Sequence, residues 1–172
     1  MFDTVLIAGL GLMGGSMAKT IKARTLSRVL GWNRTRATAE QALADGSIDA
    51  IATEALYKEA DLVIIGLYPQ ATVDWLLENM PKMKKGCVIV DMVGVKQFMV
   101  DHLEQAALDA GVHYVGGHPM AGREFSGLDF ALPTLFDGAS MIFVPTKSST
   151  ERVLEQLEAY FMSLGFGQTV RC

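Results

Sequence analysis

The sequence predicts an α/β fold of the doubly wound class, in which a mostly parallel sheet is covered by helices on both faces. Short apolar runs rich in β-branched residues alternate with longer segments of helical period. The short runs are almost continuously apolar, as expected for strands that are buried on both faces. Half of the 172 residues are apolar and a fifth are charged, which is typical of a globular protein.

Strand and helix pairs fill the first two thirds of the chain. Each expected strand is a short run of valine, isoleucine and leucine, and each expected helix carries apolar residues three and four positions apart. We expect strands at 4–9, 27–33, 61–68 and 86–92, followed in turn by helices at 12–24, 35–46, 69–83 and 95–111. This βαβ alternation predicts a parallel sheet.

The last third of the chain is less regular. We expect a strand at 112–117, an irregular stretch at 117–139, a strand at 140–145, a helix at 150–165 and a short strand at 168–172. No repeat period, low-complexity tract or linker divides the chain. We therefore expect residues 1–172 to form one domain.

The composition argues against several classes of function. The apolar start lacks a basic segment and is broken by Asp3 and by glycines, so we expect neither a signal peptide nor a membrane span. A net charge of -4 offers no basic surface for nucleic acid. Cys87 and Cys172 suggest no disulfide framework, and a reducing cytoplasm is the expected location.

The first turn carries glycines at the spacing used by dinucleotide sites. Gly9, Gly11 and Gly14 form G-x-G-x-x-G directly after the first expected strand, where Leu12 and Met13 open a helix. Such glycines permit a tight turn and close approach of a pyrophosphate, while the helix start offers free N–H groups. We predict a Rossmann-type cofactor site at these five residues. The alternative is a glycine-rich turn in another doubly wound fold.

The end of the second expected strand bears on which cofactor binds. Asn33 stands where an NAD-preferring site carries an acidic residue. No carboxylate there would repel a 2′-phosphate, Arg34 can pair with that phosphate, and Thr35 adds a hydroxyl. We expect NADP as the preferred cofactor, with NAD as the alternative. Asn33 or Thr35 could also simply cap the following helix.

The chain has 3 histidines in different settings. His118, in the segment GGHPMAG, follows an expected strand on the carboxyl side of the sheet, where ligands bind in such folds. Considered without any relative, His118 is equally open to a catalytic role and to a place in a turn. His113 falls within a strand and His102 within a helix, which favours structural or surface roles for both.

Several segments carry a further signal. They are GLGLMGGSMA near the start, VDMVGVK at 90–96, GGHPMAGREFSG at 116–127 and the following LFDGASMIFVP. Together they resemble the nucleotide-binding domain of the prephenate/arogenate dehydrogenase family, in order and at family-like spacing over essentially the whole chain. HPMAG with its following glutamate and Ser-Gly pair is much more specific than the glycine motif.

The resemblance implies oxidative decarboxylation of prephenate or arogenate in tyrosine biosynthesis, with NADP or NAD as hydride acceptor. His118 would be the catalytic base that takes the proton of the ring hydroxyl. Lys96 and Ser126 would bind or lie near the substrate, and no metal is expected. Family members also carry a C-terminal helical domain that forms the dimer and contacts substrate carboxylates. That domain would begin near Cys172 and is absent from these residues.

One residue departs from the family pattern. Many members have a serine in a D-x-x-S-x-K segment, where it can hydrogen-bond near the catalytic histidine. Here the matching segment runs from Asp91 to Lys96 and has Gly94 in the serine's place. The hydroxyl's contribution must then come from water, from Ser126, or be lost. Lys96 remains as a ligand contact or as a charge at a helix start.

Two other functions stay open at this point. One is a stand-alone NADP-binding module without catalysis, and the other is a different dehydrogenase with the same first domain, such as a β-hydroxyacid dehydrogenase. The latter family relies on a lysine in its helical domain, and nothing in its chemistry requires HPMAG.

Absence of the helical domain would also leave apolar surface uncovered. Leu154, Leu157, Phe161 and Leu164 follow helical spacing in the last expected helix. Either they face outward and favour weak self-association, or they pack on their own sheet.

Overall fold

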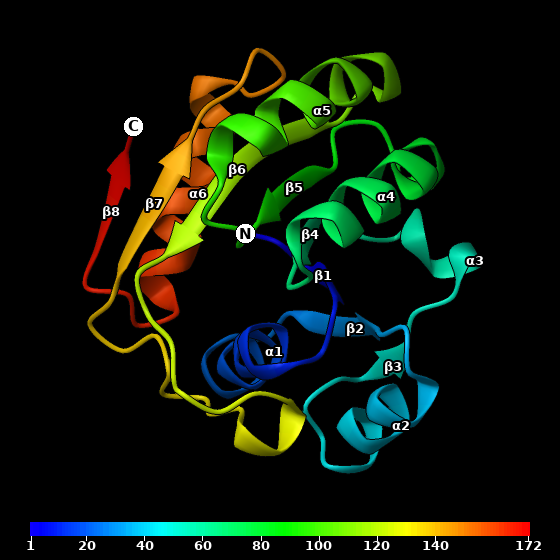
Figure 1. The fold of residues 1–172 in the computed structure, drawn as a ribbon, viewed down its shortest axis with the longest axis vertical. Coiled ribbons are helices and arrows are strands. Elements are labelled where there is room, and N and C mark those ends of the chain that lie inside the picture. The colour runs from blue at the N-terminus through cyan, green and yellow to red at the C-terminus, as the bar shows by residue number, and fades with distance from the viewer.

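The computed structural model describes all 172 residues and arranges its strands in one sheet (Figure 1). The strand order is β3-β2-β1-β4-β5-β6-β7-β8, and the neighbours from β3 through β6 are all parallel. This confirms the predicted doubly wound, mostly parallel sheet. The strands are β1 (Thr4–Ala8), β2 (Arg28–Trp32), β3 (Ala50–Ile51), β4 (Leu62–Ile65), β5 (Val88–Asp91), β6 (His113–Pro119), β7 (Ser140–Val144) and β8 (Gln168–Arg171).

Helices connect these strands and cover both faces of the sheet. They are α1 (Leu12–Arg24), α2 (Arg36–Ala44), α3 (Glu54–Tyr57), α4 (Pro69–Asn79), α5 (Lys96–Ala110) and α6 (Glu151–Ser163), with short 3-10 turns η1 (Met80–Lys82) and η2 (Leu128–Phe130). Every helix expected from the sequence is present. No helix combines the length and apolar character needed to cross a bilayer.

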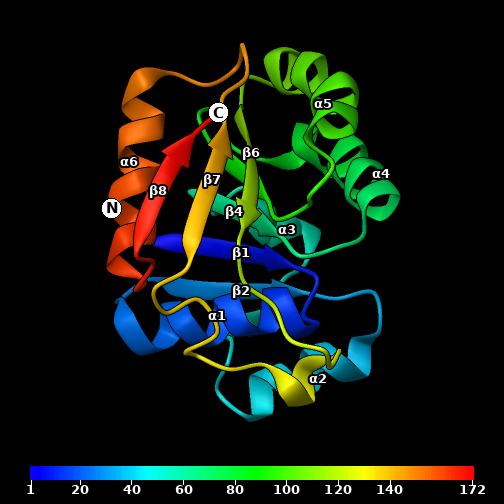
Figure 2. The same cartoon turned by 60° about the vertical axis from the view of Figure 1, so that its left-hand side comes forward.

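The core forms two apolar layers, one on each side of the sheet. Successive residues of β1 alternate between them: Val5 and Ile7 join the layer under α1 and α6, and Leu6 and Ala8 join the layer under α4 and α5. Figure 2 shows α6 on one side of the strands and α4 with α5 on the other. Because both faces are covered, β1 reads as a continuous apolar run.

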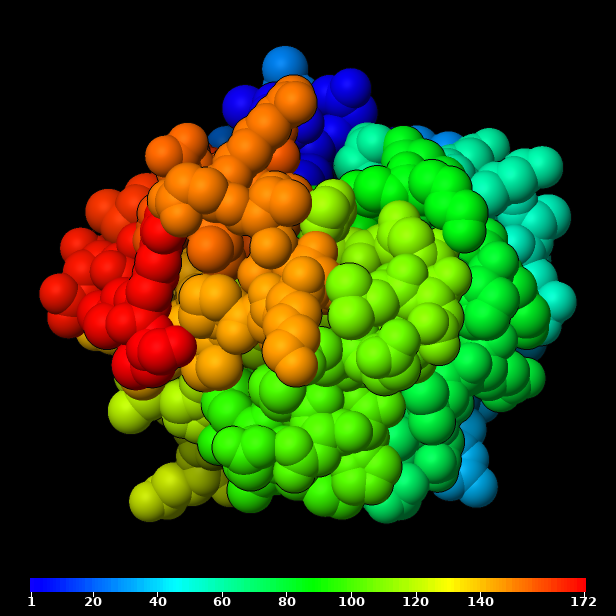
Figure 3. Space-filling view, turned by 90° about the horizontal axis from the view of Figure 1, so that it is seen from above, coloured from blue at the N-terminus to red at the C-terminus, as the bar shows by residue number.

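The sheet changes direction at one place. After pairing in parallel with β5, β6 pairs antiparallel with β7, and β8 then adds in parallel to β7. The segment from β6 to β7 contains only η2. Because the two strands are antiparallel, the chain leaves β6 and enters β7 at the same end of the sheet, and no crossover helix is needed. β8 is an edge strand, and its segment lies at the rim of the molecule (Figure 3).

The structure differs from the expected elements in several places. The two-residue β3, the single-turn α3 and η2 were not expected, since such short elements show no period. The strand expected at 112–117 extends to Pro119, so His118 lies within β6 instead of in a loop after it.

The last helix packs inward. Leu154, Leu157, Phe161 and Leu164 are at most 6% exposed and belong to the core layer on their side of the sheet. Of the two alternatives, packing on their own sheet is confirmed and the outward orientation is wrong, because these residues form the stripe that covers β7 and its neighbours.

Candidate nucleotide-binding and catalytic site

The turn from β1 to α1 is shaped by its glycines. Gly9 has a φ of 94°, a left-handed conformation that side chains disfavour. A Cβ on Gly14 would lie 1.7 Å from the Gly9 carbonyl oxygen, so only glycine allows the helix to sit this close to the strand. Gly11 is different, because a Cβ there would have nothing within 4 Å. No contact within the chain therefore requires a glycine at position 11.

The start of α1 is open to an acceptor from outside the chain. Gly11 is the N-cap and offers no side-chain acceptor, and the first turn contains no acidic residue. Leu12 and Met13, both half-buried, begin the helix. Their amides point along the helix axis toward its N-terminal end, where the dipole favours an anion.

Asn33 ties the end of β2 to the glycine turn. Its Oδ1 accepts a hydrogen bond from the Leu10 amide at 2.9 Å, and its Nδ2 donates to the Thr35 carbonyl at 3.0 Å. Thr35 is the N-cap of α2 by position, but its side chain makes no capping bond. The alternative in which Asn33 or Thr35 caps α2 with its side chain is therefore wrong. Arg34 is exposed and takes part in no ion pair within the chain.

A cavity of about 300 Å³ lies between the glycine turn, α2 and η2. Gly11 and Asn33 line one side, and Gln41 and Asp129 line the other. Gln41 Nε2 donates to Asp129 Oδ1 at 2.6 Å, which joins α2 to the segment after β6. Sequence reasoning missed Gln41 and Asp129, since nothing in the sequence indicates that two residues 88 positions apart meet here.

His118 lies on β6 at the carboxyl edge of the sheet, the edge that also carries the glycine turn after β1. Its half-buried ring lies against Gly94, where an added Cβ would be 3.1 Å from Cε1 and 3.4 Å from Nδ1. Nδ1 is buried and has no hydrogen-bond partner. Nε2 is thus the ring nitrogen left to meet a ligand.

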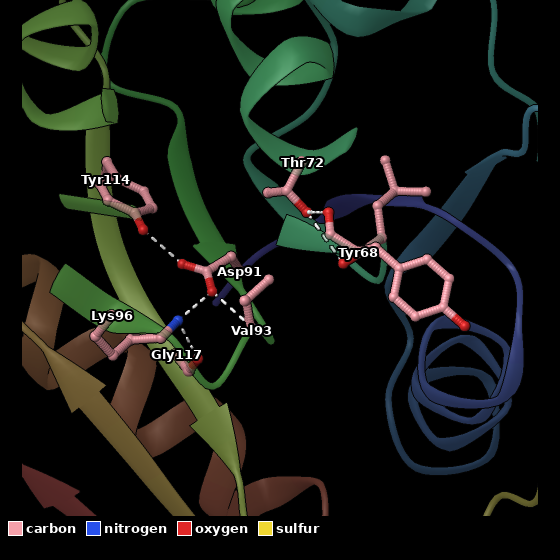
Figure 4. Close-up of polar contacts among 8 residues, drawn as sticks. Tyr68, Thr72, Asp91, Val93, Lys96, Tyr114 and Gly117 are labelled. Carbon is pink, nitrogen blue, oxygen red and sulfur yellow. Dashed lines mark hydrogen bonds and ion pairs between the residues drawn. The ribbon is translucent and has the colours of Figure 1, made fainter. Parts of the chain in front are cut away.

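Asp91, Lys96 and Tyr114 form a buried polar network (Figure 4), which reaches Gly117, the residue before His118. Asp91, at the end of β5, is fully buried and accepts hydrogen bonds from the Val93 amide at 2.8 Å, the Tyr114 hydroxyl at 2.6 Å and the Lys96 ammonium. Lys96 also donates to the Gly117 carbonyl at 2.6 Å. Burial lowers the pKa of Lys96 below its ordinary value, although Asp91 acts in the opposite direction.

Ser126 does not replace the hydroxyl that Gly94 lacks. It is exposed, in the segment between β6 and η2, and His118 Nδ1 has no partner. The stretch after η2 contacts α1, where the Leu132 amide donates to Ser16 Oγ at 3.0 Å. The option in which Ser126 takes over that hydrogen bond to the imidazole is therefore not realised in this structure.

The other two histidines have partners away from this edge. His102 Nδ1 donates to the Phe98 carbonyl at 2.7 Å on α5, and His113 Nδ1 donates to the Ser148 carbonyl at 2.6 Å. His113 borders an open hollow of about 400 Å³ at the opposite, amino edge of the sheet. That hollow is larger, but it contains none of the predicted site residues. The candidate site is therefore at the carboxyl edge.

The open helix start, the glycine turn and the adjoining cavity define a dinucleotide-binding domain of the Rossmann class. Residues 17–168 match the family model described as prephenate dehydrogenase, nucleotide-binding domain. The chain belongs to this family. The match confirms the resemblance and excludes the β-hydroxyacid dehydrogenase alternative as the family of this chain.

Individual relatives agree with the family match. The chain is 37% identical over 162 residues to a prephenate dehydrogenase of Bacillus subtilis, covering 92% of this chain and 43% of the relative. It is 28% identical over 170 residues to a cyclohexadienyl dehydrogenase of Zymomonas mobilis, covering 95% of this chain and 56% of the relative. The chain thus spans about half the length of these relatives.

Solved structures give the same result. The arogenate dehydrogenase of Synechocystis superimposes with a TM-score of 0.88 at 25% identity, covering 98% of this chain and 59% of that one. The prephenate dehydrogenase of A. aeolicus, in complex with hydroxyphenyl propionate and NAD+, gives 0.89 at 25% identity, covering 100% of this chain and 60% of that one. A 3-hydroxyisobutyrate dehydrogenase of Mycobacterium tuberculosis, at 17% identity, shares the fold.

Proposed function

We propose that this chain is the nucleotide-binding half of a dehydrogenase that oxidatively decarboxylates prephenate or arogenate with NADP, in tyrosine biosynthesis. One observation carries the proposal. The half-buried imidazole of His118, with Nδ1 buried and unpartnered, lies at the sheet edge that also bears the open glycine turn. The named activities of the prephenate, cyclohexadienyl and arogenate dehydrogenase relatives support the same assignment.

The residues of the first turn fit a dinucleotide. The open space at Gly11 leaves room for a pyrophosphate close to the backbone, and the uncapped amides of Leu12 and Met13 suit its negative charge. Gly9 and Gly14 allow the tight turn that places this helix start directly after β1. When bound, the nicotinamide would supply the hydride acceptor.

His118 is the proposed catalytic base. With its proton on the buried Nδ1, a neutral imidazole has the Nε2 lone pair free to accept the hydrogen bond of the substrate's ring hydroxyl. As the carbon bearing this hydroxyl gives up hydride, Nε2 takes the hydroxyl proton. The ring carboxylate then leaves as carbon dioxide and its bonding electrons complete the aromatic ring. Because aromatisation drives the reaction, the protein's main task is orientation of the reacting groups.

The preference for NADP rests on the end of β2. Asn33 is uncharged and its amide is already engaged with the glycine turn, while Arg34 is exposed and free of ion pairs. Arg34 and the Thr35 hydroxyl are the groups proposed to meet a 2′-phosphate. NAD is the alternative, supported by the NAD+ complex of the A. aeolicus relative and by the Asp129 carboxylate in the neighbouring cavity.

Further proposals concern the substrate and the assembly. Ser126 is exposed and available to a substrate, whereas Lys96 has partners within the chain. Because the relatives extend well beyond the matched region, we propose that further substrate contacts and the dimer interface lie in a helical domain outside these residues. The free thiols of Cys87 and Cys172 suit a cytoplasmic location.

The test is an NADPH titration, followed by a separate assay of the same preparation with prephenate and NADP+ as the hydride acceptor. Both use the chain alone and the chain mixed with the remaining half of the B. subtilis relative. We expect NADPH to bind. Where turnover is seen, His118→Ala should lower kcat about 10²–10⁴-fold, as expected for loss of a general base. The matched control is His102→Ala on the surface of α5, which should leave kcat unchanged.

Two results would change the assignment. NADPH binding with no turnover in either mixture would favour the stand-alone NADP-binding module. Turnover that survives His118→Ala would remove His118 from its proposed role while leaving the cofactor assignment intact.

A further inference from the structure

Lys96 occupies the point where two strands separate. β5 and β6 pair in parallel up to Val90 and Val115, and from Gly116 onward β6 pairs with β7 instead. No β5 residue is in register with Gly117, and the Lys96 ammonium donates to its carbonyl at 2.6 Å. His118 is the next residue. Lys96 therefore contacts the backbone that carries the imidazole.

The ammonium is held in this fork by a buried countercharge. Asp91 is 0% exposed, and the Lys96 side chain is 15% exposed. A buried carboxylate is tolerated only when it is paired and hydrogen-bonded, and Lys96 supplies the only positive charge among the donors to Asp91. With Asp91 and Gly117 both bound, the ammonium is largely committed within the chain.

The same ion pair closes the loop that touches the ring. Asp91 and Lys96 are five residues apart, and the loop between them carries Gly94, which lies against His118. Pairing of its two ends therefore fixes the position of Gly94. Lys96 thus contacts both elements that determine where the imidazole lies: the loop below the ring and the strand that carries it.

The space around this arrangement is tight. A Cβ on Gly116 would lie 3.0 Å from Lys96 Cδ, and a Cβ on Gly117 would lie 2.3 Å from the Asp91 carbonyl oxygen. The backbone of β6 therefore packs directly on Asp91 and Lys96, and it cannot move toward them.

We infer that Lys96 is a positioning residue that fixes the imidazole of His118 through the Gly117 carbonyl and the Asp91–Lys96 loop, and that it does not contact substrate. That this positioning serves catalysis rests on the proposed function. The position of the His118 ring can be tested without any turnover.

The experiment compares the full chain with Lys96→Met and Tyr114→Phe by long-range ¹H–¹⁵N NMR of the histidine rings. Lys96→Met removes the bond to Gly117 and the countercharge of Asp91. Tyr114→Phe is the matched control, because it removes one hydrogen bond to the same carboxylate and leaves the Lys96 to Gly117 bond intact. We expect Lys96→Met to shift the ring resonances of His118 and not those of His102.

Two outcomes would overturn the inference. One is an unshifted His118 in Lys96→Met. The other is an equal shift of His118 in Tyr114→Phe, which would indicate general loosening of the core. If Lys96→Met does not fold, the double variant Asp91→Asn/Lys96→Met removes both charges together and tests the same displacement of the ring.

The proposed function is checked separately by NADPH titration of the unmodified chain. Failure of the chain to bind NADPH would count against that function while the NMR comparison still decides the role of Lys96. Conversely, an unshifted His118 would overturn the positioning role without affecting the cofactor site.

Discussion

At the scale of single residues, the candidate site depends on which polar groups already have partners. Asn33 and Lys96 each make two contacts within the chain. Arg34 takes part in no ion pair, and Nδ1 of His118 is buried without a partner. Because engaged groups stabilise the chain while unengaged ones are available to a ligand, Arg34 and His118 are the residues whose loss should affect function most.

Arg34→Ala tests the preference for NADP. A hydrogen bond to a charged group contributes about 1.5–3 kcal/mol, so NADPH affinity should fall about tenfold or more. NADH affinity should change little, since NADH lacks the 2′-phosphate. Fluorescence titration with both cofactors measures the difference, and Arg28→Ala at the opposite end of β2 is the control. Equal losses for NADPH and NADH would contradict the 2′-phosphate assignment.

Sequence reasoning predicted site residues that lie next to a recognisable strand end. Asn33, Arg34 and His118 belong to this group, and the structure puts them at the carboxyl edge as expected. The partners of these residues could not be predicted. Tyr114 is 23 residues from Asp91 and Asp129 is 88 residues from Gln41, and such contacts depend on how the sheet brings distant segments together. One contact of the glycine turn did have a sequence signal. Gly66 directly follows the apolar run of β4, and a glycine at a strand end indicates close approach of another backbone, here that of Gly9.

At the scale of elements, periodicity predicted the long helices and the buried strands. It could not show the direction of β7, because an apolar strand reads the same in a parallel or an antiparallel pair. Periodicity also left two orientations open for α6, and the structure decides for the inward one. The helix packs through Phe161, whose ring centroid is 5.3 Å from that of Phe143 on β7.

Phe161→Ala tests this packing. The side chain is 0% exposed, and truncating a buried phenylalanine leaves a cavity, so the free energy of unfolding should fall by about 3–5 kcal/mol. Met162, its neighbour on the outer face of α6, is 45% exposed, and Met162→Ala should change stability by only about 0.5 kcal/mol. Urea unfolding of both variants measures the contrast. Similar losses for both would mean that α6 does not cover the sheet as described.

At the scale of the whole molecule, acidic groups at several edges link stability to pH. Burial alone would raise the pKa of Asp61. The Lys84 ammonium and the Thr4 amide together lower it by more, so the net pKa lies below 3.8. The pKa of Glu158 is lowered mainly by its hydrogen bond with Arg171. A carboxyl whose pKa is lowered by folding contributes stability above its unfolded pKa, and this contribution is lost as pH falls through the folded value.

The chain should therefore lose stability as the pH falls from about 5 to about 3. Urea midpoints at several pH values measure the loss, and Asp61→Asn should reduce the slope because one of the contributing groups is gone. Stability that stays constant or rises over this range would show that these carboxylates gain nothing from their partners in the folded chain.

The central claim is that the turn between β1 and α1 binds a dinucleotide. Alanine substitutions at Gly11 and Gly14 distinguish nucleotide binding from a purely structural role of the glycines. Alanine at Gly14 should destabilise the fold, because its Cβ would lie 1.7 Å from the Gly9 carbonyl oxygen. Alanine at Gly11 meets nothing within 4 Å in the chain itself, so only a bound ligand would encounter the added methyl group.

The measurement is therefore an NADPH titration of the chain and of Gly11→Ala, with thermal unfolding of both as the control for folding. We predict saturable binding to the unmodified chain, and a large loss of affinity in Gly11→Ala at an unchanged melting temperature. Equal affinity in the two proteins, or no binding to the unmodified chain, would contradict the placement of the nucleotide in this turn.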